Sequence, residues 1–296
     1  MAHRTLIATT AAAIVPAALM AAPTFAKPSP ATPTATAFKI GAFTAYALRD
    51  MLNVVPNDGS VLGVGQPVPA ISQILADAHA PTDQIALGVD ALLVEMPGHV
   101  VLLDTGLGPK VGGVLPLSLL DAHVEPGQVT DVLITHSHPD HIGGLVTKEG
   151  GLAFPNATIR MSAPEWAFLQ SKGGAIATVI ATKVRTFAPG AEVIPGIRSV
   201  PLPGHTPGHS GYEISSGKTR LLDIGDTAHS AIVSLAKPGW TIAYDTDAAE
   251  GRATREAELA RLAASHERIF APHFPFPGVG FVVKAGDGYS WVPKLP

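Results

Sequence analysis

The sequence predicts an α/β fold in which buried strands deliver polar side chains to one edge of a sheet. Short apolar runs end repeatedly in Asp or His beside glycine or proline, which is typical of strands that lead into functional loops. Segments with helical spacing of apolar residues lie between these runs. With 296 residues, 46% of them hydrophobic, the chain is long enough for one large domain or two small ones.

The first 26 residues have the composition of a secretory signal. An Ala-rich apolar stretch follows Arg4, Pro16 interrupts it, and Ala26 ends a small-residue cleavage pattern. A membrane anchor is the alternative, but the proline and the weak hydrophobicity disfavour a span. We therefore expect export to the periplasm or the medium, with no membrane attachment after cleavage. Residues 27–37, rich in Pro, Thr and Ala, predict a linker, and residues 38–296 predict the folded domain.

Apolar periodicity gives the expected strands and helices in chain order. Residues 89–95 and 100–103 flank Pro97-Gly98 and predict a hairpin. Residues 247–266 predict the clearest helix, because Asp247 and Glu250 fit a capping box at its start. The other predicted strands are residues 38–48, 132–134, 154–162, 220–224 and 269–271, and the other predicted helices are residues 69–79 and 164–170.

The densest group of candidate metal ligands follows the buried run at residues 132–134. His136, His138, Asp140 and His141 place three imidazoles and one carboxylate within six positions. Imidazole and carboxylate are ligands that suit zinc and similar divalent ions. Four such groups at the end of a buried strand would carry a large desolvation cost without a partner. The motif therefore predicts a metal site rather than a set of unrelated surface histidines.

Further His and Asp residues stand in later loops and strand ends. His205 and His209 lie in a loop stiffened by three prolines, and His273 enters another proline-rich loop. Asp226 follows the predicted strand at residues 220–224. Asp104 ends the strand at residues 100–103, where it is either a turn residue or an acceptor that orients a metal-bound imidazole.

Composition excludes several classes of function. The net charge is −4 with no long basic run, so nucleic acid is not an expected partner. The chain has no cysteine, which excludes disulfides, thiolate zinc sites and a cysteine nucleophile. The expected partner is a small-molecule substrate, and a homodimer is left open.

Taken together, His136-x-His138-x-Asp140-His141, Gly204-His205, Gly225-Asp226 and His273 resemble the metallo-β-lactamase superfamily of metal-dependent hydrolases, over about residues 38–291. Within it, segments such as 152–157, 204–209 and 275–280 resemble the methyl parathion hydrolase branch, which contains exported enzymes acting on phosphotriesters, lactones and aryl esters. The resemblance implies a four-layer αβ/βα sandwich with a dinuclear metal site on one edge.

The resemblance also implies roles for the residues that match it. The first of two divalent ions, expected to be zinc, is held by His136, His138 and His205. The second ion is held by Asp140, His141 and His273, and Asp226 bridges the two. Asp104 matches an acid outside the ligand set, and His209 matches a residue that supports its loop.

The expected reaction is hydrolysis by a metal-bridging hydroxide. Two divalent ions about 3.5–4 Å apart lower the pKa of a shared water to about 7, so no Ser or Cys nucleophile is needed. Asp140 and Asp226 contribute as charged ligands at the reacting centre. His229 stands where some lactonase relatives carry a tyrosine, so it either assists the substrate or is a hydrogen-bonding residue at the pocket rim. The substrate, the native metal and the oligomeric state are not determined by the sequence.

Four aromatic residues are candidates for an apolar pocket wall, which would favour hydrophobic esters, lactones or organophosphates. They are Trp166, Phe168, Phe274 and Phe276, and each is equally open to a role in the core. Two other functions are weighed against hydrolysis. A non-catalytic exported zinc-binding protein needs only four ligands and no bridge. A true β-lactamase is disfavoured because Asp226 as a bridge suits esters and phosphotriesters in this superfamily better than lactams.

Overall fold

The structure, a computed structural model, describes residues 29–295. The predicted signal at residues 1–26 therefore lies outside the described residues. No helix in the described part of the chain is both long enough and apolar enough to cross a membrane.

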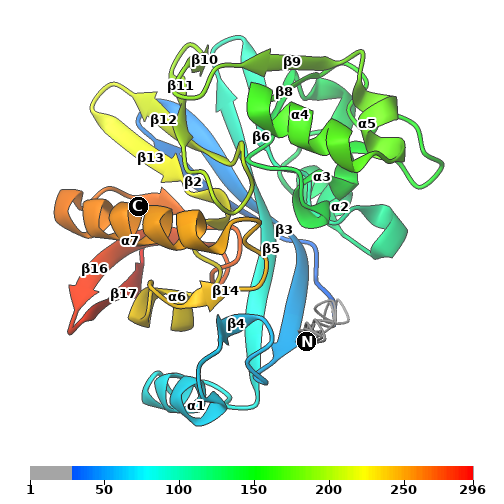
Figure 1. Cartoon of the computed structure of the whole chain (residues 1–296). Helices are drawn as coiled ribbons and strands as arrows, with labels where there is room; N and C mark the ends of the chain where they lie inside the picture. Colours follow the sequence, from blue (N-terminus) through cyan, green and yellow to red (C-terminus); the bar gives the residue numbers. More distant parts are fainter. Residues whose placement is uncertain (1–28, 296) are drawn as a thin grey trace, which may run out of the picture.

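Two mixed sheets form the centre of the molecule (Figure 1). The first has eight strands in the order β1-β3-β5-β6-β7-β8-β9, with β2 paired to β3. Its strands are β1 (Ser29–Pro30), β2 (Ala35–Ile40), β3 (Phe43–Pro56), β5 (Gln84–Met96), β6 (His99–Leu103), β7 (Asp131–Leu133), β8 (Thr158–Ser162) and β9 (Val184–Phe187). The second has seven strands: β10 (Glu192–Ile194), β11 (Ile197–Pro201), β12 (Ser210–Ser216), β13 (Thr219–Asp223), β15 (Ile269–Phe270), β16 (Val279–Ala285) and β17 (Gly288–Pro293).

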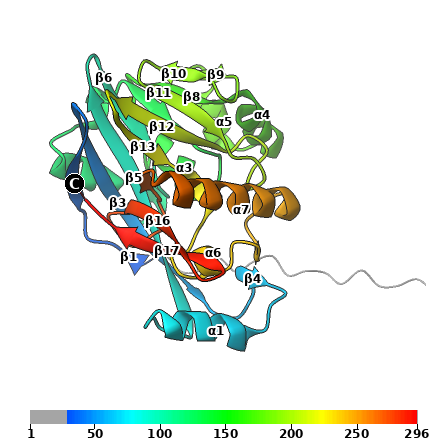
Figure 2. The same ribbon diagram turned by 90° about the vertical axis from the view of Figure 1, so that its left-hand side faces the viewer.

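Helices cover the outer face of each sheet. Those packed on the first sheet are α2 (Leu115–Asp121), α4 (Ala163–Lys172) and α5 (Ala175–Ile180), and those packed on the second are α6 (Val233–Ala236) and α7 (Ala248–Ser265). Figure 1 shows the first three helices on the side of the first sheet, and Figures 1 and 2 show α7 lying across the second. The predicted four-layer αβ/βα sandwich is confirmed.

Alternate residues of each central strand serve different layers of the core. In β5, Leu92 and Val94 pack between the sheets, whereas Leu93 packs under the helices of the first sheet. In β13, Leu221 faces the space between the sheets and Leu222 faces α7. Because both faces of each sheet are buried, these strands are continuous apolar runs rather than alternating ones. That is why their apolar runs could be recognised in the sequence.

A smaller core supports the end of the molecule where α1 (Val68–Asp77) lies. There β4 (Leu62–Val64) pairs with β14 (Thr241–Ile242), and Ile71 and Leu75 of α1 are buried against them. Figure 1 shows this unit beyond the lower ends of β3 and β5. The unit is relevant to function because the chain leaving β14 runs toward the polar edge of the sandwich.

Two expectations about the first strands need correction. The single strand expected at residues 38–48 is a hairpin, because Gly41 adopts a φ of 58° and turns the chain between β2 and β3. Part of the expected linker is strand, since Ala35, Thr36 and Ala37 pair with β3 in the same ladder. The predicted hairpin of β5 and β6 and the predicted helix α7 are confirmed, the latter with Asp247 as its N-cap.

Candidate metal centre

The histidine-rich motif follows β7 at the edge where both sheets end. The strand stops at Leu133, His136 and His138 lie in the connecting loop, and the short helix α3 (Pro139–Ile142) carries Asp140 and His141. The loop after β11 supplies His205 and His209, the turn after β13 supplies Asp226, and the loop after β15 supplies His273. Residues far apart in the sequence therefore meet at one edge of the sandwich.

Three imidazoles form the first set of candidate ligands. The Nε2 atom of His136 is 3.1 Å from His138 Nδ1 and 3.1 Å from His205 Nε2, and the last two atoms are 2.8 Å apart. Asp226 Oδ2 lies 3.2 Å from His205 Nε2 and 3.6 Å from His136 Nε2. These four donor atoms enclose a single small space.

Asp140, His141 and His273 form the second set. His141 Nε2 is 3.8 Å from Asp140 Oδ1, and His273 Nε2 is 3.7 Å from Asp140 Oδ2. Asp226 again joins them, because its Oδ1 atom is 3.1 Å from His141 Nε2 and its Oδ2 atom is 3.1 Å from His273 Nε2. One buried carboxylate thus contacts both sets.

The donor geometry fits divalent ions. Atoms bound at about 2.0–2.1 Å around a tetrahedral zinc lie about 3.3 Å from one another, close to the separations within the first set. In the second set, His141 Nε2 and Asp226 Oδ1 are buried and have no hydrogen-bond partner among the described residues. Such atoms are costly to bury unless a cation satisfies them. The two sets together match the donor types that zinc takes without thiolate.

Two imidazoles and the shared carboxylate have the protonation state that a metal ion needs, whereas Asp226 and the neighbouring acids outweigh burial and raise the pKa of His141, His205 and His273. Burial and the neighbouring His141 hold the pKa of His136 well below its usual value, and burial with His205 lowers the pKa of His138 to about 3. Both imidazoles are therefore neutral at pH 7 and offer a lone pair. Burial acts to raise the pKa of Asp226, but His141 and His273 outweigh it and hold that pKa well below its usual value. Asp226 is therefore a carboxylate anion across the physiological range.

Asp104 and His209 contact residues of the cluster on atoms that are not candidate metal ligands, namely His141 Nδ1 and Asp226 N. Asp104 Oδ2 is 2.7 Å from His141 Nδ1, and its carboxylate also accepts hydrogen bonds from Thr135 N and Oγ1. This fixes the His141 ring with Nε2 toward Asp226. His209 Nδ1 lies 2.8 Å from the carbonyl oxygen of Leu202, and its Nε2 accepts a 3.0 Å hydrogen bond from Asp226 N.

Asp245 is a partner that the sequence analysis did not identify. Its Oδ1 atom is 3.0 Å from His205 Nδ1, and its Oδ2 atom is 3.1 Å from Arg255 in α7. The side chains of Asp245 and Arg255 are 0% and 1% exposed. A buried ion pair therefore stands behind His205 and holds its Nε2 toward the first set.

His229 and Tyr244 lie beside the cluster. His229 Nε2 is 3.1 Å from Asp226 Oδ2, its ring stacks on His273 at 5.1 Å, and its Nδ1 has no hydrogen-bond partner among the described residues. Burial lowers the pKa of His229 to about 4. The Tyr244 ring is 5.6 Å from His229, and burial together with Asp140 and Asp226 raises the pKa of Tyr244 to about 12. The phenol therefore keeps its proton at neutral pH.

The four aromatic residues expected in a pocket wall are not gathered in one place. Phe274 is fully buried against Trp291 in the core beneath α7, so its assignment to the pocket is wrong. Phe276 packs on the core between the sheets, with the Arg49 guanidinium 4.3 Å above its ring. Phe168 is half-buried beside the Lys172 ammonium, and Trp166 is half-buried against the core of the first sheet.

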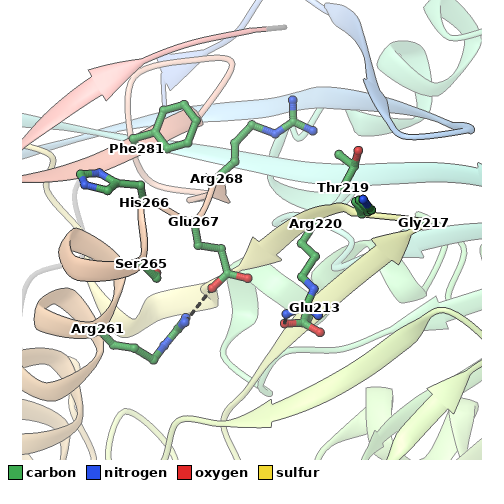
Figure 3. A pocket seen from close by; sticks show the side chains of 11 residues that line it. Glu213, Gly217, Thr219, Arg220, Arg261, Ser265, His266, Glu267, Arg268 and Phe281 are labelled. Carbon is green, nitrogen blue, oxygen red and sulfur yellow. Dashed lines mark hydrogen bonds and ion pairs between the residues drawn. The ribbon is translucent and has the colours of Figure 1, made fainter.

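A surface hollow also lies at the other end of the second sheet (Figure 3). It is bounded by the turn between β12 and β13, and by the end of α7. Two of its three arginines lie beside acids, since Arg261 donates to Glu267 at 2.7 Å and Arg220 lies 3.8 Å from Glu213, and Arg268 donates to the carbonyl oxygen of Lys39 at 2.6 Å. Asp226 follows the opposite end of β13, so the hollow is separate from the histidine cluster.

A family model described as the metallo-beta-lactamase superfamily matches residues 85–273. Among curated proteins, a Bacillus subtilis protein, "Uncharacterized protein YobT", is 31% identical over 137 residues, which are 42% of this chain and 56% of that protein. The chain spans about half the length of that relative.

Two solved structures are similar over most of the chain. AidC, described as a dizinc quorum-quenching lactonase in complex with a product, has a TM-score of 0.82 and 28% identity, covering 88% of this chain and 98% of its own. AbOPH, described as a hydrolase in the beta-lactamase superfamily, has a TM-score of 0.81 and 29% identity, covering 89% of this chain and 98% of its own.

Proposed function

This chain belongs to the metallo-beta-lactamase superfamily, and we propose that it is a dinuclear metal-dependent hydrolase of ester or lactone bonds. The observation that carries the proposal is the position of Asp226. Its carboxylate contacts the three-histidine set and the set of Asp140, His141 and His273 at the same time. A site for one structural zinc needs four ligands and no shared acid, so a storage or sensor protein does not account for this arrangement.

The proposed ligand assignment follows the two sets. His136, His138 and His205 hold one ion, Asp140, His141 and His273 hold the other, and Asp226 is shared. Two such ions, with zinc as the proposed metal, would supply an activated water and polarise the bond that is cleaved.

The chain's own residues prepare that reaction. Asp104 and Asp245 hold His141 and His205 with their Nε2 atoms toward the cluster. Asp140 is the most exposed of the acids in the cluster, at 23%, so it marks the side from which a substrate enters. His229 presents to the same space a buried imidazole whose Nε2 lies 3.1 Å from Asp226 Oδ2, and we assign it to contact with the substrate oxygen or the leaving group.

The substrate class is proposed from the relatives and from the pocket chemistry. AidC is described as a lactonase, which supports lactones and related carboxylic esters as the first choice. The resemblance of residues 152–157, 204–209 and 275–280 to the methyl parathion hydrolase branch supports phosphotriesters as the second. A β-lactam substrate has no comparable support. Export through the signal at residues 1–26, a periplasmic location and a homodimer are further proposals.

A hydrolysis screen tests the function directly. The metal-loaded mature protein is assayed with aliphatic lactones, aryl esters, aryl phosphotriesters and a β-lactam, beside an Asp226→Asn variant prepared in the same way. We expect turnover of at least one of the first three classes, with Asp226→Asn reduced on the order of 10²-fold or more. Absence of turnover on every class by a fully loaded protein would contradict the proposal.

A further inference from the structure

Glu165 is a buried carboxylate that joins two loops of the candidate metal centre. It lies in the first turn of α4 and is 0% exposed. Its Oε1 atom accepts hydrogen bonds from Ser137 N at 2.7 Å and from Ser137 Oγ at 2.5 Å. Its Oε2 atom accepts from Thr206 Oγ1 at 2.6 Å and from Gly208 N at 3.1 Å. Both oxygens are therefore used, each for a different loop.

The donors stand directly beside candidate ligands in the chain. Ser137 separates His136 from His138, and Thr206 follows His205. The two loops are otherwise distant in sequence, yet the three imidazole nitrogens lie within about 3 Å of one another. One side chain thus sets how closely the two loops approach.

The local sequence has the spacing of a capping box, but the Glu165 side chain does not make the capping hydrogen bond. Ser162 caps α4 by accepting a hydrogen bond from Glu165 N, which gives the Ser-x-x-Glu spacing of a capping box. In that motif the Glu side chain returns to the backbone N–H of the cap residue, whereas here it reaches out to both loops. Departures from a local rule of this kind are found at functional sites.

The backbone is shaped to allow this contact. A Cβ atom on Gly208 would lie 2.2 Å from Glu165 N, so only glycine lets the start of α4 approach the loop. Ser162 Oγ also donates a 2.7 Å hydrogen bond to Gly208 O. The helix start and the loop are therefore fixed to one another.

We propose that Glu165 is a positioning residue that sets the spacing between His136, His138 and His205, and so sets the metal affinity of the three-histidine set. This inference rests on the proposed function, because it assumes that the set holds an ion. Buried hydrogen bonds to a carboxylate are among the stronger ones, so the arrangement is organised before metal binds. Partners of this kind change metal affinity by about 10–100-fold when they are removed.

The effect is selective for one set. His141 is held by Asp104, and His273 Nδ1 lies 2.6 Å from the carbonyl oxygen of Gly88. Neither contact involves Glu165. Removing the carboxylate therefore weakens the three-histidine set and leaves the binding of the second ion close to that of wild type, since its outer partners are intact.

The test uses Glu165→Gln in the full mature protein, with Zn²⁺ affinities measured by competition against a chromophoric chelator. The amide cannot accept on its nitrogen, so one loop loses its acceptor while the side-chain shape is kept. We expect one of two affinities to fall about 10–100-fold and the other to stay. The visible absorption of the Co²⁺-loaded protein should change in parallel, because it reports the geometry of the weakened set.

Glu258→Gln is the matched control. Glu258 is also a largely buried helix glutamate, but it accepts hydrogen bonds from Arg261 at the far end of α7. It should lower the melting temperature without changing either affinity or the Co²⁺ spectrum. Equal losses at both sets in Glu165→Gln, or a lower melting temperature with both affinities unchanged, would overturn the proposal.

Two further variants keep the proposal testable if Glu165→Gln does not fold. Thr206→Val and Ser137→Ala each remove a single donor to the carboxylate, and each should weaken the same affinity in the same direction. Unchanged affinities in both variants would also overturn the proposal. Wild-type protein that binds no metal would instead refute the proposed function, whatever the variants do.

Discussion

Replacing Asp245 by Asn tests how the three-histidine set is held from behind. The substitution keeps the shape of the side chain but removes the charge that lies 3.0 Å from His205 Nδ1 and 3.1 Å from the Arg255 guanidinium. Loss of a carboxylate behind a ligating imidazole lowers metal affinity by about 10–100-fold. Leaving Arg255 buried without its partner costs about 3–5 kcal/mol of folding free energy.

The pH dependence of that stability has a definite sign. Burial acts to raise the pKa of Asp245, but the His205 hydrogen bond and Arg255 outweigh it, so the folded protein has a lowered pKa. A group with a lowered pKa stabilises the folded state at pH values above its unfolded pKa of about 3.9. This stabilisation is lost as the pH falls through the pKa of the folded protein. The difference in stability between wild type and Asp245→Asn should therefore be largest near pH 7 and shrink below about pH 4.

Arg255→Met separates the two effects. It breaks the same ion pair but leaves the Asp245–His205 contact in place, so it should lower stability while changing zinc affinity far less than Asp245→Asn does. Urea unfolding with metal chelated gives the first quantity, and chelator competition gives the second. An Asp245→Asn protein with wild-type zinc affinity, or equal affinity losses in the two variants, would refute the reasoning.

Three further predictions concern other residues. Asp226→Ala should lose far more activity than His229→Ala, whose loss is on the order of 10²-fold, because only the first removes a group shared by both sets; equal and near-total losses in a rate assay would make His229 a ligand or the general acid. Trp166→Ala should lower kcat/KM for an aryl ester about 10–200-fold more than for a small aliphatic lactone. A large drop in melting temperature with an unchanged ratio of kcat/KM for the two substrates would place the ring only in the core. Burial raises the pKa of Asp90 well above its usual value. Wild type should therefore lose stability as the pH rises above about 4, and Asp90→Asn should flatten that dependence in unfolding measurements. Parallel curves of stability against pH for the two proteins would contradict this prediction.

The meeting of the seven side chains could be anticipated because their signals are local, whereas the four-layer sandwich was expected from the resemblance that these residues carry. His136, His138, Asp140 and His141 fall within six positions after a buried strand, and strand ends meet at one edge of a sheet. His205 and His273 lie in loops whose prolines restrict the backbone. Local order of this kind is visible in the sequence.

The partners behind the ligands could not be anticipated in the same way. Asp245 is 40 residues from His205, and Glu165 is 28 residues from Ser137. Neither stands in a metal-ligand motif, and only tertiary packing brings them into contact. The burial of Arg255 could not be predicted from the helix pattern, because an arginine in an amphipathic helix is usually exposed.

The assignment of Phe274 to the pocket wall was wrong for a related reason. Phe274 and Phe276 are two residues apart in a short irregular segment, and the sequence does not say which layer each one faces. The structure buries Phe274 beneath α7, whereas Phe276 packs between the sheets. An aromatic residue beside a candidate ligand is therefore weak support for a binding role.

The number of metal ions bound per chain tests whether the two sets of side chains hold two ions. Purified mature protein is saturated with zinc, freed of loosely bound ions and analysed for metal per chain, beside His205→Ala and His273→Ala. We expect about two ions for wild type and about one for each variant, since each histidine belongs to a different set. A reproducible value near one or zero for the saturated wild type would contradict this expectation.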